Sequence, residues 1–445
     1  MSDHAPRAAG ATAQRGFGET SGAGPGRPRV SDAMRALEVD PRLIGMLAAL
    51  VAIWVGFDLL SGGAFLTPRN LWNLSVQTAS VAVMACGMVL VIVTRNIDLS
   101  VGAILGVTGM LIGVLQARVL PDIVGLENPL TWVIAVIAAI VIGGAIGLFQ
   151  GALIAWLSIP SFIVTLGGLL VWRGAAWWVT QGQTVAPMDG RFRMLGGGVE
   201  GAIGATASWI IGGVAAAAIA VALLLARRRR LGFGFPVRPV WAEAVVMVLA
   251  VGAVLGAVMV ANSYPLPVGI ARRMVEAAGG SWVPGTFIAH GLAIPVLVAI
   301  GVGIAITVLT TRTRFGRAVF AIGGNPEAAE LGGINTRRTI MLVFGLMGAL
   351  CGIAACISTA RLNAATNAAG SLDELYVIAA AVIGGTSLAG GAGTIAGAML
   401  GALVMQSLQS GMVLLGVDAP MQNIVVGLVL VLAVWLDTVY RRRVK

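Results

Sequence analysis

The chain has 445 residues, of which 58% are hydrophobic and 11% charged, with a mean hydropathy of +0.93. A soluble domain is about 45–50% apolar and about 25% charged, so this composition excludes a soluble protein and indicates an integral membrane protein. The formal net charge of +10 comes from arginines that cluster at the ends of apolar runs, which is typical of cytoplasmic loops and not of nucleic-acid binding.

The N-terminal segment, residues 1–42, is rich in glycine, alanine and arginine and has no apolar run. This composition predicts a disordered basic tail. The segment lacks the apolar stretch of a secretory signal, so we do not expect it to be a cleaved signal peptide. Its arginines favour a cytoplasmic location.

Apolar runs fill the rest of the chain, and a helix needs about 20 such residues to cross a hydrocarbon core of about 30 Å. The sequence therefore predicts an all-α polytopic integral membrane protein with about 10–12 transmembrane helices in residues 43–440. The runs at 101–119 and 376–389 are compatible with short, broken or re-entrant segments. The twelve predicted spans are 43–60, 71–94, 101–119, 131–157, 162–180, 209–226, 241–262, 287–310, 339–360, 376–389, 394–415 and 419–437.

Basic residues mark one side of the membrane at four places. If the chain starts inside and crosses at every predicted span, all four places fall in the cytoplasm, where positive loops are retained. We therefore expect both termini to be cytoplasmic. The loops 181–208 and 263–286 then lie outside, where they can meet an extracytoplasmic partner. The four basic markers are Arg95, residues 227–230, residues 312–338 and residues 441–443.

Polar side chains stand at two turns between predicted spans. Asp98 and Ser100 open the 101–119 run, where they can cap a helix or contact a hydroxylated solute near an inner gate. Ser161 and Thr165 are four residues apart and share a helix face. Their hydroxyls can bond back to their own backbone or line a polar path. The sequence leaves both alternatives open.

Glycines recur at four-residue spacing in three predicted spans. Such stripes allow helix backbones to approach closely in lipid, so we expect them to be packing surfaces. The three sets are Gly143, Gly147 and Gly151; Gly252 and Gly256; and Gly393, Gly397 and Gly401.

Isolated charged and reactive side chains inside the apolar runs have structural explanations. For Arg173 we expect a snorkelled or paired structural role, because an unpaired charge in a span is costly. His290 has no second histidine or carboxylate at helical spacing, so we expect a hydrogen-bonded histidine and not a metal ligand. Cys86, Cys351 and Cys356 lie in apolar runs, which favours burial as small hydrophobic side chains.

The segment 312–338 is an arginine-rich island between two long apolar runs. Its centre predicts a short surface helix, because Asn325 can cap it and Pro326 suits a first turn. Glu327 suits the positive N-terminal end of the helix dipole, and the glycine pair that begins at Gly332 ends the helix. A short cytoplasmic helix of this kind is a natural docking point for a soluble partner.

Lys445, the last residue, is the only lysine in the chain. A nucleotide-binding P-loop needs a lysine after its glycines, so this chain has no such loop. If ATP powers the protein, the ATPase must be another subunit. A self-sufficient secondary sugar transporter and a membrane-integral enzyme remain the alternatives.

Four motifs, in order along the chain, resemble those of the permease subunit of bacterial monosaccharide ABC importers. The similarity covers roughly residues 43–440, and the segment around 227–262 looks most like the xylose-type members. The chain departs from the family at Arg95 and Asn96, where many relatives carry glycine or an acidic residue. The motifs are residues 94–103 (TRNIDLSVGA), 160–167 (PSFIVTLG), 316–335 (GRAVFAIGGNPEAAELGGIN) and 382–391 (VIGGTSLAGG).

This resemblance implies a permease for a monosaccharide, such as D-xylose or a related sugar, in the bacterial inner membrane. It implies no enzymatic activity and no cofactor in this chain, and three partners: a sugar ABC ATPase subunit, a periplasmic sugar-binding protein and a second permease copy. The coupling helix of the family corresponds here to Asn325, Pro326, Glu327, Ala328, Ala329 and Gly332. Because a neutral sugar needs hydroxyls and amides, the expected path residues are Asp98, Ser100, Ser161, Thr165, Thr386 and Asn423.

Overall fold

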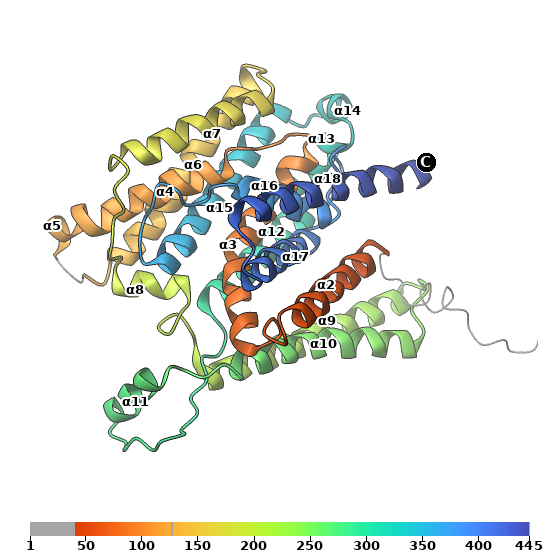
Figure 1. Ribbon diagram of the computed structural model, residues 1–445. Helices are drawn as coiled ribbons and strands as arrows, with labels where there is room; N and C mark the ends of the chain where they lie inside the picture. The colour runs from red at the N-terminus through yellow and green to blue at the C-terminus, as the bar shows by residue number, and fades with distance from the viewer. Residues whose placement is uncertain (1–40, 126–127, 445) are drawn as a thin grey trace, which may run out of the picture.

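The computed structural model describes residues 41–125 and 128–444, and its regular elements there are all helices (Figure 1). The predicted tail, residues 1–42, lies outside the described residues except for its last two. The elements are α2 (Pro41–Leu60), α3 (Pro68–Val93), α4 (Val101–Val114), the π-turn η1 (Leu115–Val119), α5 (Leu120–Val124), α6 (Thr131–Trp156), α7 (Ser161–Trp178), α8 (Gly190–Arg193), the 3₁₀ turn η2 (Met194–Gly196), α9 (Gly204–Gly232), α10 (Val240–Asn262), α11 (Val268–Ala277), α12 (Ile294–Arg312), α13 (Arg314–Gly324), α14 (Pro326–Leu331), α15 (Thr336–Leu362), α16 (Asp373–Ile383), α17 (Ile395–Leu414) and α18 (Ala419–Val444).

Nine helical stretches in the described part of the chain are long and apolar enough to cross a membrane. The predicted all-α polytopic membrane fold is therefore confirmed. The run at 101–119 is not broken, because α4, η1 and α5 form one helical stretch, Val101–Val124. The run at 376–389 overlaps only α16, a helix of 11 residues that ends at Ile383. At 1.5 Å per residue this helix reaches about 16 Å, roughly half of a hydrocarbon core.

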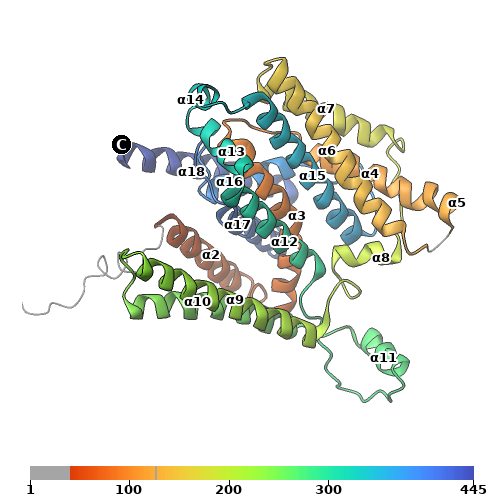
Figure 2. The same cartoon turned by 180° about the vertical axis from the view of Figure 1, so that it is seen from behind.

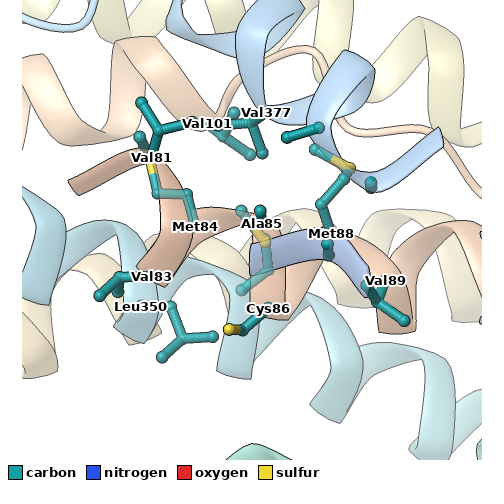
Figure 3. Packing of buried hydrophobic residues seen from close by; sticks show 14 of the residues in the cluster. Val81, Val83, Met84, Ala85, Cys86, Met88, Val89, Val101, Leu350 and Val377 are labelled. Carbon is teal, nitrogen blue, oxygen red and sulfur yellow. The ribbon is translucent and has the colours of Figure 1, made fainter. Parts of the chain in front are cut away.

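The centre of the bundle is α3, which α12, α15, α16 and α17 surround (Figures 1 and 2). In its most apolar stretch 89% of the residues are buried. Figure 3 shows Met84, Cys86 and Val89 of α3 packed among side chains of neighbouring helices, with Leu350 and Val377 nearby. All three cysteines are buried and free, as the sequence predicted.

Two of the three glycine stripes are packing seams. A side chain at Gly143 or Gly147 of α6 would collide with the backbone of α15, and one at Gly397 or Gly401 would collide with the backbone of α16. Backbone contact of this kind is what small residues permit between helices in lipid. At Gly252, as at Gly256, an added side-chain carbon meets nothing within 4 Å. Within the described residues this α10 pair is therefore not a packing surface, contrary to the expectation, because that face of α10 meets no other described element.

The α9–α10 hairpin lies at the side of the bundle. Only 11% of the residues in the most apolar stretch of each helix are buried. An aromatic group holds the hairpin to α3 at one end: the Trp72 indole lies 5.6 Å from the Tyr264 ring and donates a hydrogen bond of 2.9 Å to the carbonyl of Gly291. At the other end of the hairpin Arg227 pairs with Glu243.

The two ends of the molecule are distinct. Figures 1 and 2, which differ by a rotation about the vertical, place α13 and α14 at one end and α11 at the opposite end. The α3 helix runs between these ends, with Pro68 toward the α11 end and Val93 toward the α13 end. The α3 helix is therefore the central element that reaches from one end of the protein to the other.

Candidate functional site

A polar cavity of about 480 Å³ lies between α3, α15, α16 and α17. It is toward the α11 end of the bundle, because it is lined by the first half of α3 and the last turns of α15 and α17. Its size falls within the range of about 300–1,000 Å³ that is usual for small-molecule sites. The polar residues that line it are Asn70, Asn73, Gln77, Ser80, Ser358, Arg361, Asp373, Gln406, Gln409 and Ser410.

One face of α3 supplies four of these side chains. Asn70, Asn73, Gln77 and Ser80 are spaced by three, four and three residues, which places them along one side of a helix. The helix starts cleanly before them, because the Thr67 hydroxyl accepts a hydrogen bond from the Asn70 amide and Pro68 follows in the first turn. The α3 helix therefore presents a stripe of amides and a hydroxyl to the cavity while its other sides are buried in the core.

The α17 wall adds Gln406, Gln409 and Ser410. The Ser410 hydroxyl donates to the Asn70 side-chain oxygen at 3.4 Å, which joins the two walls. The Gln406 side-chain oxygen is buried and has no hydrogen-bond partner in the structure, while the whole residue is only 6% exposed. A buried amide oxygen without a partner is unusual, and here it borders a cavity large enough for a solute that can donate to it.

A charged corner completes the lining. Arg361 lies in the last turn of α15, and Asp373 begins α16. The loop before α16 is fixed by Arg173, whose guanidinium donates to the carbonyls of residues 367, 369 and 370 at 2.7–3.1 Å. The predicted structural role of Arg173 is confirmed, and its partners are backbone carbonyls. Through this loop Arg173 sets the place of Asp373.

Four of the six expected path residues come together elsewhere, at the start of α4 and α7. The Ser100 hydroxyl lies 2.6 Å from the Asp98 carboxylate and 2.9 Å from the side-chain oxygen of Gln150. The Asp98 carboxylate also accepts from the Ser100 amide at 2.8 Å, which closes a local turn, whereas the Ser100 side chain makes no cap hydrogen bond to α4. Thr165 bonds back to the carbonyl of Ser161 at 2.9 Å. The two polar residues at the α4 turn are thus engaged with each other, and Ser100 is also engaged with Gln150.

The other two expected path residues are separate from this group. Thr386 is buried in the loop between α16 and α17, and its hydroxyl has no partner in the structure. Asn423 is exposed on α18. None of the six lines the 480 Å³ cavity. The signal that would have found the cavity is the helical spacing of amides in the 71–94 and 394–415 runs.

The arginine-rich island folds as α13, α14 and the start of α15. The Asn325 side chain accepts a hydrogen bond of 3.1 Å from the Ala328 amide, which confirms the predicted cap. Pro326 opens α14 and Gly332 ends it. Ala329 is buried against the chain itself at 6% exposure, whereas Ala328 is exposed and Leu331 is 91% exposed. The free face of α14 therefore carries Ala328 and Leu331.

His290 lies in the loop before α12 and stacks on Tyr264 with ring centroids 4.1 Å apart. Its Nδ1 atom is 3.3 Å from the Tyr264 carbonyl. Burial lowers the pKa of this histidine, and the backbone hydrogen bonds of Tyr264 and Pro265 offset part of that effect. Among the described residues no group of three or more His, Cys, Asp and Glu side chains is arranged to hold a metal.

In comparisons with known proteins, the chain matches permease components of transport systems. The chain matches the family described as branched-chain amino acid transport system permease component over residues 70–238 and 191–434. It is 38% identical to the xylose transport system permease protein of Escherichia coli K12, over 89% of this chain and 92% of that protein. It is 33% identical to the ribose import permease protein of the same strain (88% and 92% covered) and 28% identical to its D-allose transport system permease protein (88% and 89%). No solved structure matches the chain.

Proposed function

Since the chain belongs to the family of branched-chain amino acid transport system permease components, we propose that it is the membrane-spanning subunit of an ATP-driven importer for a monosaccharide, D-xylose or a related sugar. The observation that carries the proposal is the similarity to the xylose permease along 92% of that protein's length. Ribose and D-allose permeases at 33% and 28% identity support the same class of substrate.

The 480 Å³ cavity is the proposed outer part of the sugar path. A sugar is neutral and carries several hydroxyls, so it needs hydrogen-bond donors and acceptors and no countercharge. The amides of Asn73 and Gln77 supply both donors and acceptors. Arg361 and Asp373 add charge-assisted hydrogen bonds at one corner, which are shorter and stronger than neutral ones. The unpartnered oxygen of Gln406 suits a sugar hydroxyl as its donor.

The polar group around Asp98, Ser100, Ser161 and Thr165 is proposed as a contact near the inner end of the same path. It lies by the α3–α4 turn, toward the α13 end of the bundle. In the structure its side chains bond to one another and to Gln150 or the backbone. Thr386 and Asn423 stay in the proposal as weaker candidates, because one is enclosed and the other is exposed on α18.

The partners follow from the class of transporter. Importers of this class use a separate ATPase and a soluble binding protein. We place the ATPase on the coupling helix of residues 325–332, which comprises Asn325, Pro326, Glu327, Ala328, Ala329 and Gly332. The sugar-binding protein would meet the loops 181–208 and 263–286 at the opposite end. A second copy of this chain would complete the permease, with both termini in the cytoplasm of a bacterial inner membrane.

Reconstitution tests the proposal directly. The chain should be placed in liposomes with the ATPase that co-purifies with it and with its sugar-binding protein. ATP on the ATPase side should drive accumulation of D-xylose, and no uptake should occur without the ATPase. A parallel set of liposomes holding only this chain should not accumulate the sugar when a proton gradient is imposed. Accumulation in that second set would replace the proposal with a secondary transporter.

A further inference from the structure

Three segments that are far apart in the sequence meet at the α13 end of the bundle. They are the end of α3, the end of α13 and the loop before α17. The Gly391 amide donates a hydrogen bond of 3.0 Å to the Val93 carbonyl. A side chain at Gly323 would collide with the Val93 carbonyl and the Gly391 backbone, so the three backbones touch. We refer to this contact as the triple junction.

Arg95 stands at the centre of the triple junction in an unusual backbone conformation. The α3 helix ends with the Arg95 amide bonded to the Ile92 carbonyl at 2.9 Å and the Asn96 amide bonded to the Val91 carbonyl at 3.1 Å. This pair of bonds is the Schellman arrangement, which places residue 95 in the left-handed region and is usually closed by glycine. Arg95 has φ 63° there, a backbone conformation that is unfavourable for a residue with a side chain.

The Arg95 side chain binds the end of another helix. Its Nε donates to the Gly323 carbonyl at 2.9 Å, and its Nη2 donates to the Gly324 carbonyl at 2.6 Å. These are the last two residues of α13. A cation is favourable at a helix C-terminus, and a charged donor makes a stronger hydrogen bond than a neutral one. Asn325, the cap of α14, follows directly.

We propose that Arg95 is a positioning residue that couples the α13–α14 segment to α3, so that a force on the docking helix is transmitted to the cavity wall. The idea rests on the proposed function. Asn73 and Gln77, on the first half of the same buried helix, line the cavity. Because α3 is one continuous helix from Pro68 to Val93, a shift of its Val93 end along the helix axis would carry the stripe of polar side chains with it.

The strained backbone suggests a decisive variant, Arg95→Gly. Glycine adopts φ 63° without strain, so the end of α3 should keep its hydrogen bonds and the variant should fold. The two bonds to α13 are lost. We expect the amount of D-xylose moved per ATP hydrolysed to fall at least about five-fold in the reconstituted importer, a typical size for coupling between sites. Arg95→Lys keeps the charge but not the two-pronged donor, so its ratio of D-xylose moved to ATP hydrolysed should lie between those of the unaltered protein and Arg95→Gly.

Two further measurements make the result unambiguous. Arg228→Ala alters an exposed arginine in the last turns of α9 and should leave the transport ratio unchanged. Hydrogen exchange on the detergent-solubilised chain alone should show faster exchange of the amides at residues 325–331 in Arg95→Gly, because the end of α13 loses the two side-chain hydrogen bonds that tie it to the end of α3.

The outcomes separate the two proposals. An unchanged transport ratio in Arg95→Gly overturns the coupling role, and lower stability with an unchanged ratio would reduce Arg95 to a structural residue. Unchanged exchange at residues 325–331 would show that the side chain does not hold α13 at all. If the unaltered protein shows no ATP-dependent uptake, the proposed function fails. The exchange experiment still decides whether the Arg95 side chain holds the end of α13.

Discussion

The α3 helix and the α9–α10 hairpin are equally good membrane spans by length and apolar composition, yet they occupy opposite environments. In α3, 89% of the residues in the most apolar stretch are buried, whereas in α9 and in α10 the share is 11%. Apolarity therefore identifies a span without saying whether lipid or protein surrounds it. In a membrane both surroundings are apolar, so hydrophobicity does not distinguish them.

What distinguishes the two regions is the distribution of polar and small residues. The stripe of Asn70, Asn73, Gln77 and Ser80 on α3 is tolerable because a polar cavity receives it. The hairpin has no comparable stripe between residues 244 and 261, and its glycines Gly252 and Gly256 face open space. Polar side chains inside a span therefore indicate a protein-facing or water-facing surface.

The largest expected effect concerns packing. Gly147→Leu inserts a side chain where α6 meets the backbone of α15 at Phe344 and Gly348. We expect a loss of more than about 3 kcal/mol, or failure to fold, because neither backbone can move aside. Gly252→Leu on the hairpin should change stability by less than about 1 kcal/mol. Thermal unfolding in detergent measures both, and equal losses would remove the structural contrast between bundle and hairpin.

The next effect concerns transport. Gln77→Leu replaces a cavity amide with an apolar side chain of similar size, and we expect D-xylose uptake to fall about ten-fold or more, since each lost hydrogen bond to a buried sugar hydroxyl costs about 1–3 kcal/mol. Met259→Leu, on the exposed face of α10, should transport normally. Uptake by the reconstituted importer tests the pair. Normal uptake by Gln77→Leu would show that the cavity is not on the path.

A smaller effect separates the α14 end of the bundle from the Arg227 end of the hairpin. Ala328→Arg places a large charged side chain on the free face of α14. The control variant, Phe235→Arg, places the same side chain on the exposed loop of the hairpin. We expect the first to weaken binding of the ATPase several-fold by steric exclusion and the second to have little effect. Binding of the purified ATPase to each variant in nanodiscs gives the comparison. Equal weakening would move the docking site toward the hairpin.

The smallest effect concerns the aromatic attachment of the hairpin. Burial lowers the pKa of His290 below its ordinary value of 6.5, so the unfolded chain binds the proton more readily than the folded one. Stability should therefore be constant above about pH 6.5 and decline as the pH falls below it. His290→Phe should lack this decline, with a difference in Tm of a few degrees at most at pH 5.5. Parallel pH profiles for both proteins would assign the titration to another group.

Sequence reasoning identified most of the fold, because long apolar runs and the Asn325 cap are local signals. It misjudged the Gly252 and Gly256 pair, because which side of a helix faces a neighbour is decided by tertiary contacts. It also missed Asn73, Gln77 and Gln406, although their helical spacing is visible in the sequence. The contact of Arg95 with α13 spans 228 residues, and no local pattern reports a bond between such distant segments.

The most direct test of this account is the accessibility of position 77 during the transport cycle. The three native cysteines are buried, so a single new thiol in Gln77→Cys can be followed with a membrane-impermeant reagent added on the outer side of the reconstituted importer. A matched thiol in Met259→Cys reports on the hairpin. We predict that a non-hydrolysable ATP analogue changes labelling at position 77 several-fold and leaves position 259 unchanged. Labelling at position 77 that is the same with and without the nucleotide would contradict a cavity on α3 that opens and closes under the control of the ATPase.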